Sequence, residues 1–569
     1  MYEFHMTFTS MGVRVEVPCR QIESAILKWA EEHMHAPKMG KQYGRIFTER
    51  GDPYYAHIPS LRSFIFHRNF SERLRIIINR TATEFGIEYK LYEHYLTQGT
   101  PYRCKFENYG FKMVEDDEKS RFFYQNAVVE TACEPNRFQT IFEIGTGMGK
   151  SKTNMKVMVR KGVRTLLIHR PTYISKWMFD LTEDPTGLRE SKDDVLVIQG
   201  VQAIYEALEM GESGELDKRG IKVIIISTVT LQRFLKEYIN TAATNPVNID
   251  DFYNTLGVGF LSMDEVHEHF HLVYMAGIML NPPPSVEMSA TLQPGESKAF
   301  LAERYRERFP QESRIFIPII PAVHVKALYY SIENKRFAWW ANKMTPYNHK
   351  LFEGKLISEN MHLSYADMVW DVIERTYLAS YQPGQKVLVL FATVAMCEFF
   401  TEYVREKLAQ SDKFHALMVA KYNAGDSYDD FIQADFSIST PGKAGTAVDK
   451  PGLVHMYITT PVEDQQLNRQ MAGRPRKILH NDWGELDPVV WLFHSLSIGK
   501  HCNYLNARQK SLSDSVLSFK IASSPYVVRK TNVTTAAADR ASSTVCRAEL
   551  SKFSRKGFKG IPRRRKRRR

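Results

Sequence analysis

The sequence lacks three features that would place it in well-defined protein classes. It has only six cysteines in 569 residues, and none forms a C-x-x-C pair or stands beside histidines at zinc-ligand spacing. We therefore expect reduced thiols and no structural zinc site. No run of about 18 or more apolar residues occurs, and the N-terminal segment has neither a basic start nor a small-residue cleavage site. These absences argue against membrane spans and secretion and predict a cytoplasmic protein.

The chain also has little net charge outside its C-terminal end. The formal net charge is +12, yet residues 552–569, KFSRKGFKGIPRRRKRRR, hold eleven Lys or Arg residues and no acid, so subtracting those eleven leaves +1 for the body. A block of like charge with glycine and proline cannot bury a core, and we expect a disordered tail that binds nucleic-acid phosphates or acidic partners. A solubilising tail, or a nuclear-localisation signal in a eukaryotic cell, fits the same residues.

A glycine-rich stretch, FEIGTGMGKSKT at residues 142–153, carries the strongest functional pattern. The apolar run before it predicts a strand and the residues after it predict a helix, so the glycines lie on a strand-to-helix turn. Glycine lets the backbone approach a ligand closely, and the helix presents its positive end, which together make an anion cradle. The candidate phosphate-binding residues are Gly145, Thr146, Gly147, Met148, Gly149, Lys150 and Ser151.

Lys150 fits a phosphate clamp and Ser151 fits a ligand of Mg²⁺. The strict phosphate-loop pattern G-x-x-x-x-G-K-[ST] nevertheless requires a glycine at 144, where the chain has Ile144. A flexible basic turn is therefore the alternative interpretation of this segment.

Two series of short apolar runs, within 139–291 and within 386–493, alternate with helical segments. Such runs are typical of parallel sheets covered on both faces, so we predict an α/β fold with two tandem doubly wound domains. The expected boundaries are a small α+β accessory domain at 1–115 that could bind nucleic acid, a first α/β domain at 116–300, a connector at 301–370, a second α/β domain at 371–510 and a flexible region with the basic tail at 511–569. Only the first α/β domain has a glycine-rich turn suited to phosphate, which predicts a nucleotide site at the interface of the two α/β domains.

A pair of carboxylates follows one of the apolar runs, in LSMDEVHEHF. Asp264 at the end of the strand fits a ligand that holds Mg²⁺ through water, and Glu265 can orient or deprotonate an attacking water. His267, His269 and His271 alternate along the same segment. We do not predict a metal site for them, because no cysteine or carboxylate stands at zincin spacing.

The order of GTGMGKS, DEVH, SAT, STPGKAGTAVD and QMAGRPRK along the chain resembles superfamily 2 helicases and translocases of the DExH type. The layout is most similar to phage UvsW-like helicases, which also begin with a small α+β domain. The resemblance covers about 120–500. It implies tandem RecA-like domains, ATP and Mg²⁺ as cofactors, and nucleic acid as partner, with DNA favoured over RNA.

The resemblance also implies roles for residues of the first domain. Lys150 would clamp the β- and γ-phosphates, Ser151 and Asp264 would hold Mg²⁺, and Glu265 would handle the water. His267 would couple the nucleotide to Ser289 and Thr291 of SAT. Gln125, in RFFYQNAVVE, corresponds to the adenine-reading glutamine.

For the second domain, the resemblance implies that Arg474 reaches the phosphates as an arginine finger, an effect of ~10³ to 10⁵ in rate in related systems. Gln470 opens the same Q-x-x-G-R-x-x-R pattern, and Gly445 corresponds to a nucleotide-binding glycine. The last arginine of the pattern falls at Lys477, and Arg476 lies one position early. Either Arg476 replaces it or the second finger is missing.

The leading hypothesis is therefore a monomeric ATP-dependent DNA helicase or translocase, including action on branched DNA in phage replication, recombination or repair. An RNA helicase, a double-strand translocase without strand separation and a non-catalytic nucleic-acid-binding scaffold are the alternatives. Five loop residues fall where phosphate contacts are expected, although a cap or turn role fits each one equally. They are Pro171, Thr172, Thr228, Thr393 and Thr440.

Overall fold

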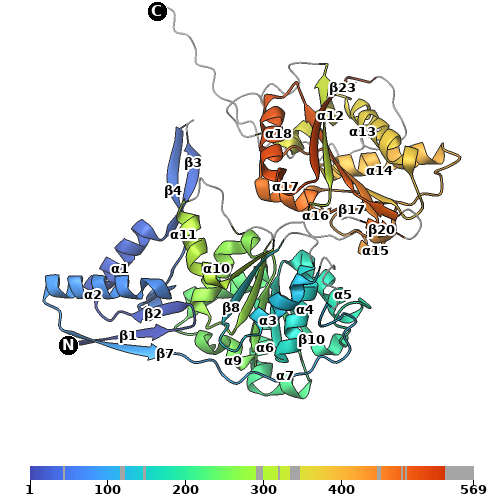
Figure 1. The fold of residues 1–569 in the computed structure, drawn as a ribbon. Helices are drawn as coiled ribbons and strands as arrows, with labels where there is room; N and C mark the ends of the chain where they lie inside the picture. Colours follow the sequence, from blue (N-terminus) through green and yellow to red (C-terminus); the bar gives the residue numbers. More distant parts are fainter. Residues whose placement is uncertain are drawn as a thin grey trace, which may run out of the picture. The chain divides into compact units, whose positions relative to one another are not determined.

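The computed structural model describes residues 1–42, 45–115, 122–144, 149–289, 292, 299–317, 321–333, 347–444, 450–475, 478–480 and 484–531. The chain divides into two compact units, Met1–Pro318 and Ile319–Arg569 (Figure 1). Within the described ranges, no helix combines the length and the apolar character that crossing a bilayer requires.

The first unit begins with a small α+β module built on a five-stranded sheet of order β5-β6-β2-β1-β7. Its elements are β1 (Tyr2–Phe8), β2 (Gly12–Glu16), α1 (Arg20–His33), β5 (Ala56–Ile58), β6 (Ser63–His67), α2 (Ser71–Phe85) and β7 (Tyr89–Tyr95), with a separate hairpin of β3 (His35–Gln42) and β4 (Arg45–Pro53). Alternation along β1 places Phe4, Met6 and Phe8 in the core, together with Ile22 and Ile26 of α1.

The rest of the first unit is a seven-stranded sheet of order β10-β11-β9-β12-β13-β8-β14, in which every pairing is parallel. Its strands are β8 (Gln139–Ile144), β9 (Thr165–His169), β10 (Val195–Ile198), β11 (Val223–Ser227), β12 (Phe260–Met263), β13 (Ser285–Ser289) and β14 (Arg314–Ile317). Its helices are α3 (Tyr124–Ala132), α4 (Lys150–Lys161), α5 (Ile174–Thr182), α6 (Val201–Glu212), α7 (Glu215–Lys218), α8 (Thr228–Thr241), α9 (Phe252–Thr255), α10 (Phe270–Met279) and α11 (Ala299–Arg308). β11, VIIIS, is buried at every position, as a sheet covered on both faces requires.

The N-terminal module shares one hydrophobic core with this parallel sheet. β2 lies against α10 so closely that a Cβ on Gly12 would stand 2.1 Å from the carbonyl oxygen of Ile278. Arg14, also on β2, donates to both carboxylate oxygens of Asp250 at 2.8 and 2.6 Å. The module is therefore built into the first unit.

The second unit holds another seven-stranded parallel sheet, of order β17-β18-β16-β19-β22-β15-β23. Its strands are β15 (His324–Ile332), β16 (Lys386–Leu390), β17 (Val419–Tyr422), β18 (Phe436–Ser439), β19 (Leu453–Ile458), β22 (Val489–Ser495) and β23 (Ser518–Val528), beside a hairpin of β20 (Ile478–His480) and β21 (Gly484–Leu486). Its helices are α12 (His349–Ser358), α13 (His362–Thr376), α14 (Val394–Ala409), α15 (Tyr428–Gln433), α16 (Pro441–Ala444), α17 (Gln465–Ala472) and α18 (Gly499–Leu512). The predicted fold class, two tandem RecA-like doubly wound domains behind a small α+β module, is confirmed.

Two expected segments differ from the structure. The segment 301–370, expected to be a connector, supplies β14 to the first sheet and β15, α12 and most of the amphipathic α13 to the second unit. The region from 511, expected to be flexible, supplies β23, which pairs with β15 from His324↔Ser518 onward. β23 is an edge strand with mostly exposed side chains, so it lacks the apolar pattern that would reveal a strand.

Candidate functional site

The glycine-rich turn leads directly into helix α4. Gly149 precedes the first helical residue, Lys150, with φ of 77°, a left-handed conformation that favours glycine. A Cβ at Gly149 would also stand 2.6 Å from Nε2 of Gln125, a buried residue of α3. The predicted adenine-reading glutamine therefore lies against the backbone of the turn. Residues 145–148 lie outside the described residues.

Ile144, the departure from the strict phosphate-loop pattern, is the last residue of β8. Its side chain is fully buried, and it pairs in register with Ile317 of β14. A glycine here would remove core packing, so Ile144 extends the strand up to the start of the turn.

Lys150 forms an ion pair with Glu265 across the carboxyl end of the sheet. Its Nζ lies 2.7 Å from Glu265 Oε1, and the two side chains are only 10% and 8% exposed. Glu265 follows β12 and takes a left-handed backbone conformation with φ of 50°. Such a conformation is uncommon for a residue with a side chain, and here the carboxylate lies against Lys150.

Asp264 lies beside this pair. Its Oδ1 accepts a hydrogen bond of 2.9 Å from the backbone N–H of Glu265. Burial raises the pKa of Asp264, while the nearby Lys150 lowers it and Glu265 raises it. An ionised Asp264 therefore depends on positive charge in its surroundings.

The three alternating histidines serve three different contacts. His267 Nδ1 lies 2.6 Å from Ser289 Oγ at the end of β13 and 3.5 Å from Glu265 Oε2. His269 Nε2 lies 3.0 Å from Arg170 Nε, and His271 Nε2 lies 2.6 Å from a backbone carbonyl of the N-terminal module. Among the residues that the structure describes, no group of three or more His, Cys, Asp or Glu side chains could hold a metal ion. Ala290 and Thr291 of SAT are outside that part of the chain.

A further charged contact joins this segment to the loop after β9. Arg170 Nε lies 2.7 Å from Glu268 Oε2, and burial raises the pKa of Glu268 to about 7, while Arg170 lowers it. Pro171 and Thr172 follow in the 3₁₀ turn Pro171–Tyr173 that leads into α5. The loop expected to contact nucleic acid is thus tied to the DEVH segment.

One residue at the site was missed by sequence reasoning. Lys176 of α5 donates a hydrogen bond of 3.1 Å from Nζ to Ser151 Oγ, and its Nζ also lies 2.5 Å from Asp180 Oδ2. No sequence pattern marks this lysine, because the contact joins two helices whose relative placement depends on the sheet.

In the second unit, Gln470 lies on α17, and Arg474 follows the end of this helix. Gln470 is buried and Arg474 is partly exposed. The helix is held by α18, because Arg508 donates to Asn468 Oδ1 at 2.7 Å and Arg469 donates to the carbonyl of Ser511 at 2.9 Å. The other predicted residues of this domain, Gly445, Arg476 and Lys477, lie outside the described residues.

The loop after β16 contains Thr393, for which a phosphate contact and a cap role were both expected. Glu353 of α12 accepts hydrogen bonds of 2.7 Å from the N–H of Ala392 and from the N–H and hydroxyl of Thr393. Thr393 Oγ1 also accepts from the N–H of Met396 and so caps α14. A buried carboxylate therefore already uses the donors that a phosphate would need.

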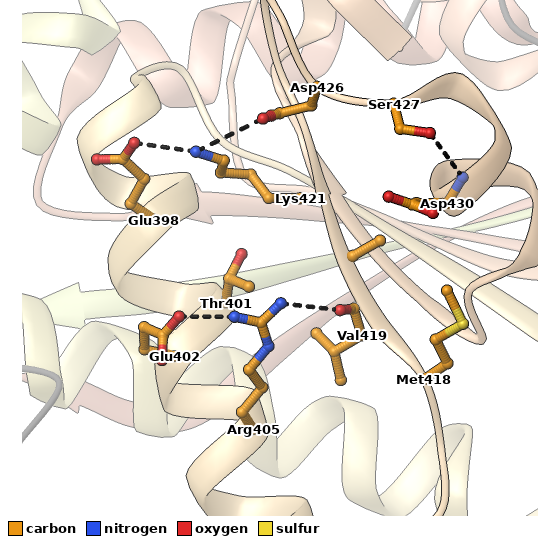
Figure 2. Close-up of a pocket in the computed structure, with 11 residues that line it drawn as sticks. Glu398, Thr401, Glu402, Arg405, Met418, Val419, Lys421, Asp426, Ser427 and Asp430 are labelled. Atoms are coloured by element: carbon orange, nitrogen blue, oxygen red, sulfur yellow. Dashed lines mark hydrogen bonds and ion pairs between the residues drawn. The ribbon is translucent and has the colours of Figure 1, made fainter.

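A cavity of about 520 Å³ lies elsewhere in the second unit, between α14, the edge strand β17 and the start of α15 (Figure 2). Its two cations are paired with its own carboxylates: Lys421 Nζ lies 3.1 Å from Glu398 and Arg405 donates to Glu402 at 2.7 Å. Arg405 also donates to the carbonyl of Val419 on the edge strand (Figure 2). No predicted site residue lines it, and it resembles a protected sheet edge more than a nucleotide site.

Comparison with known proteins gives matches in structure alone. No protein-family model matches the chain, and no curated protein matches it. One similar solved structure is the DEAD-box helicase Mss116 bound to ssRNA and UDP-BeF, with 10% identity over 70% of this chain and 74% of that chain and a TM-score of 0.45. Another is T4 UvsW, with 13% identity over 93% of this chain and 100% of that chain and a TM-score of 0.27. A third is S. cerevisiae Dbp5 bound to RNA and ADP BeF3, with 11% identity over 70% of this chain and 89% of that chain and a TM-score of 0.42. At these TM-scores the matches do not define the site, which the side chains above define.

Proposed function

We propose that this protein is an ATP-dependent nucleic-acid motor of the superfamily 2 helicase type. One observation carries the proposal: the Lys150–Glu265 ion pair of 2.7 Å beside the half-buried Asp264, after a glycine-rich turn. The three side chains follow the carboxyl ends of parallel strands, where open α/β sheets bind their ligands. A lysine, a metal-ligand carboxylate and a water-handling carboxylate are the groups that phosphoryl transfer to water requires.

In this proposal Lys150 changes its partner when ATP binds. The triphosphate offers oxygens to the Lys150 ammonium, which then leaves the Glu265 carboxylate. A carboxylate that loses a neighbouring ammonium gains proton affinity, because opposite charge favours its ionised form. ATP binding therefore converts Glu265 from an ion-pair partner into the group that orients and deprotonates water.

Asp264 and Ser151 are the residues that would hold Mg²⁺. A half-buried carboxylate whose pKa is raised by desolvation suits a divalent cation, and hydroxyl and carboxylate oxygens are ligands that Mg²⁺ accepts. Bound with ATP, Mg²⁺ would neutralise charge that develops on the phosphates.

His267 gives the site a connection to the rest of the first domain. Its ring lies between Glu265 and Ser289, so a movement of the carboxylate reaches the end of β13 through two short contacts. We assign to this connection the transfer of nucleotide state to the nucleic-acid-binding loops, with Thr291 as the next residue of the path.

The second domain supplies the remaining groups in the proposal. Arg474 acts as the arginine finger, with Gln470 beside it on α17. Gly445 contributes to nucleotide binding, and Arg476 or Lys477 takes the place of the last arginine. Turnover then requires the two domains to close around the nucleotide.

DNA is the nucleic acid that we propose, including branched DNA in phage replication, recombination or repair, with the tail at 552–569 as an additional phosphate-binding segment. An RNA helicase and a double-strand translocase without strand separation would use the same site. Strand displacement measured on forked DNA, RNA duplex and linear duplex distinguishes them.

The test of the proposal is ATP turnover with and without DNA. We expect stimulation by DNA, and a loss of at least about 100-fold in Lys150→Ala and in Glu265→Gln, as for removal of a catalytic proton acceptor. Lys152→Met is the matched control, because this lysine lies on the same helix but donates to Thr186 at the surface. Undiminished turnover in both site variants would refute the assignment, and a wild type that binds DNA without turnover would favour the scaffold alternative.

A further inference from the structure

The ammonium of Lys176 contacts the hydroxyl that is predicted to bind the metal. Lys176 Nζ lies 3.1 Å from Ser151 Oγ, and Ser151 is the first residue after Lys150 in α4. A second lysine therefore stands beside one of the predicted metal ligands.

Lys176 has an alternative partner on its own helix. Its Nζ lies 2.5 Å from Asp180 Oδ2, one helical turn along α5. Burial raises the pKa of Asp180 and Lys176 lowers it, so the ionised carboxylate depends on this lysine. The ammonium can thus leave Ser151 and remain paired.

We propose that Lys176 is a positioning residue that couples metal and nucleotide binding at Ser151 to helix α5. This inference rests on the proposed function. With Mg²⁺ and ATP bound, Ser151 Oγ would be a ligand of the metal, and Lys176 would withdraw to Asp180. The Ser151–Lys176 contact therefore opens and closes with the nucleotide state.

Electrostatics gives the reason for the exchange. A divalent cation and an ammonium that both contact one hydroxyl repel each other. Lys176 is 31% exposed at its side chain, which gives it room to move. Ser151 and Asp264 would both hold the metal, which has the larger charge, so Lys176 would be the cation that moves away.

Because of the position of α5, the exchange of partners by Lys176 affects the loop that precedes this helix. The helix follows directly on the turn Pro171–Tyr173, which contains the residues predicted to contact nucleic acid. Arg170 before the turn is itself paired with Glu268. Releasing α5 from Ser151 therefore changes the attachment of this loop at one end, while the DEVH segment holds it at the other.

The test measures the Mg²⁺ dependence of binding a non-hydrolysable ATP analogue by calorimetry, with no turnover involved. In Lys176→Met a competing cation is lost, so we expect half-saturation at a Mg²⁺ concentration lower by about 5-fold or more, in the range of allosteric coupling. Lys176→Arg keeps the charge and should resemble wild type. Arg160→Met, which removes a positive charge from the far end of α4 where Arg160 pairs with Glu130, is the matched control and should not shift.

Asp180→Asn is a second variant, and it should shift the Mg²⁺ dependence in the opposite direction. It removes the partner to which Lys176 withdraws, so more Mg²⁺ should be needed than in wild type. In Lys176→Met the analogue should also no longer change the affinity for a single-stranded DNA probe. A Mg²⁺ dependence that is unchanged or weaker in Lys176→Met, or unchanged in Asp180→Asn, overturns the inference. If the wild type does not bind the analogue at all, the proposed function itself fails.

Discussion

Buried charged residues gather around the segment that follows β12. Glu265 is paired with Lys150 and Glu268 with Arg170, at 2.7 Å in each case. His169, at the end of β9, is fully buried against Trp177, and burial lowers its pKa to about 3, so it stays neutral. An unpaired charge in such surroundings would cost several kcal/mol, which is why Glu265 and Glu268 each lie against a cation.

Glu268 offers a pH-dependent test at the residue scale. Burial raises its pKa from 4.5 to about 7, against the opposing effect of Arg170. The folded state therefore holds an extra proton between these pH values, and this contribution to the free energy of unfolding is present below pH 4.5 and lost as the pH rises through 7. Its size is on the order of 3 kcal/mol at most.

In Glu268→Gln the side chain stays neutral at every pH. We expect its thermal unfolding midpoint to exceed that of wild type by a few degrees at pH 8 and to match it near pH 4.5. Differential scanning calorimetry across this range checks the expectation. A difference between the two proteins that does not vary with pH would contradict the assignment of the raised pKa to Glu268.

Contacts between elements decide how the N-terminal module is attached. Gly12 of β2 leaves no room for a side chain beside Ile278 of α10, and Arg14 pairs with Asp250. The sulfur of Met34, the residue after α1, lies 3.0 Å from Nη1 of Arg304 on α11. The module is therefore anchored by its sheet and by the end of its first helix.

Gly12→Ala tests this attachment at the element scale. The new Cβ would stand 2.1 Å from a backbone oxygen, so β2 or α10 must shift, and we expect a loss of about 1 to 3 kcal/mol in the free energy of unfolding of the first unit. Gly442→Ala is the control, because nothing lies within 4 Å of its Cβ position. Denaturant unfolding that is equal in the two variants would show that the module is attached less closely than described.

The second unit shows how a C-terminal extension becomes part of a domain. α18 holds α17 through Arg508 and Arg469, and the following β23 completes the sheet beside β15. α17 carries Gln470 and leads to Arg474. The extension therefore supports the helix on which the proposed arginine finger depends.

At the scale of the whole molecule, the proposed reaction needs residues from both units. Arg474→Ala should lower ATP turnover by about 10³-fold or more and leave the affinity for an ATP analogue nearly unchanged, because an arginine finger acts on the transition state. Steady-state turnover and calorimetric binding measure the two effects. Arg469→Ala, which breaks the contact of α17 with α18, separates a loss of the finger from a loss of helix position. Turnover that survives Arg474→Ala would remove the second unit from the chemistry.

The basic tail provides a second expectation at this scale. Deletion of 552–569 removes eleven positive charges, so the salt dependence of DNA affinity should flatten, since each phosphate contact releases counterions. Turnover at saturating DNA should be largely retained. Filter binding between about 50 and 200 mM salt makes the measurement. An unchanged slope would assign the tail to targeting or solubility.

The sequence by itself determined the local parts of the site. A strand, a glycine turn and a helix are encoded by neighbouring residues, and together they place Lys150 at the carboxyl end of the sheet. The same holds for Asp264 and Glu265 after β12. The resemblance to helicase motifs implied that these residues act together, and parallel strands bring their carboxyl ends to one side of the sheet.

Only the tertiary structure decided the contacts between segments that are distant in sequence. It brought Lys176 to Ser151, placed Glu353 on the loop of Thr393, and paired β23 with β15 across the second sheet. No period of 2 or 3.6 residues encodes such contacts. They arise when packed helices and strands bring side chains within a few ångströms, and that depends on the whole core.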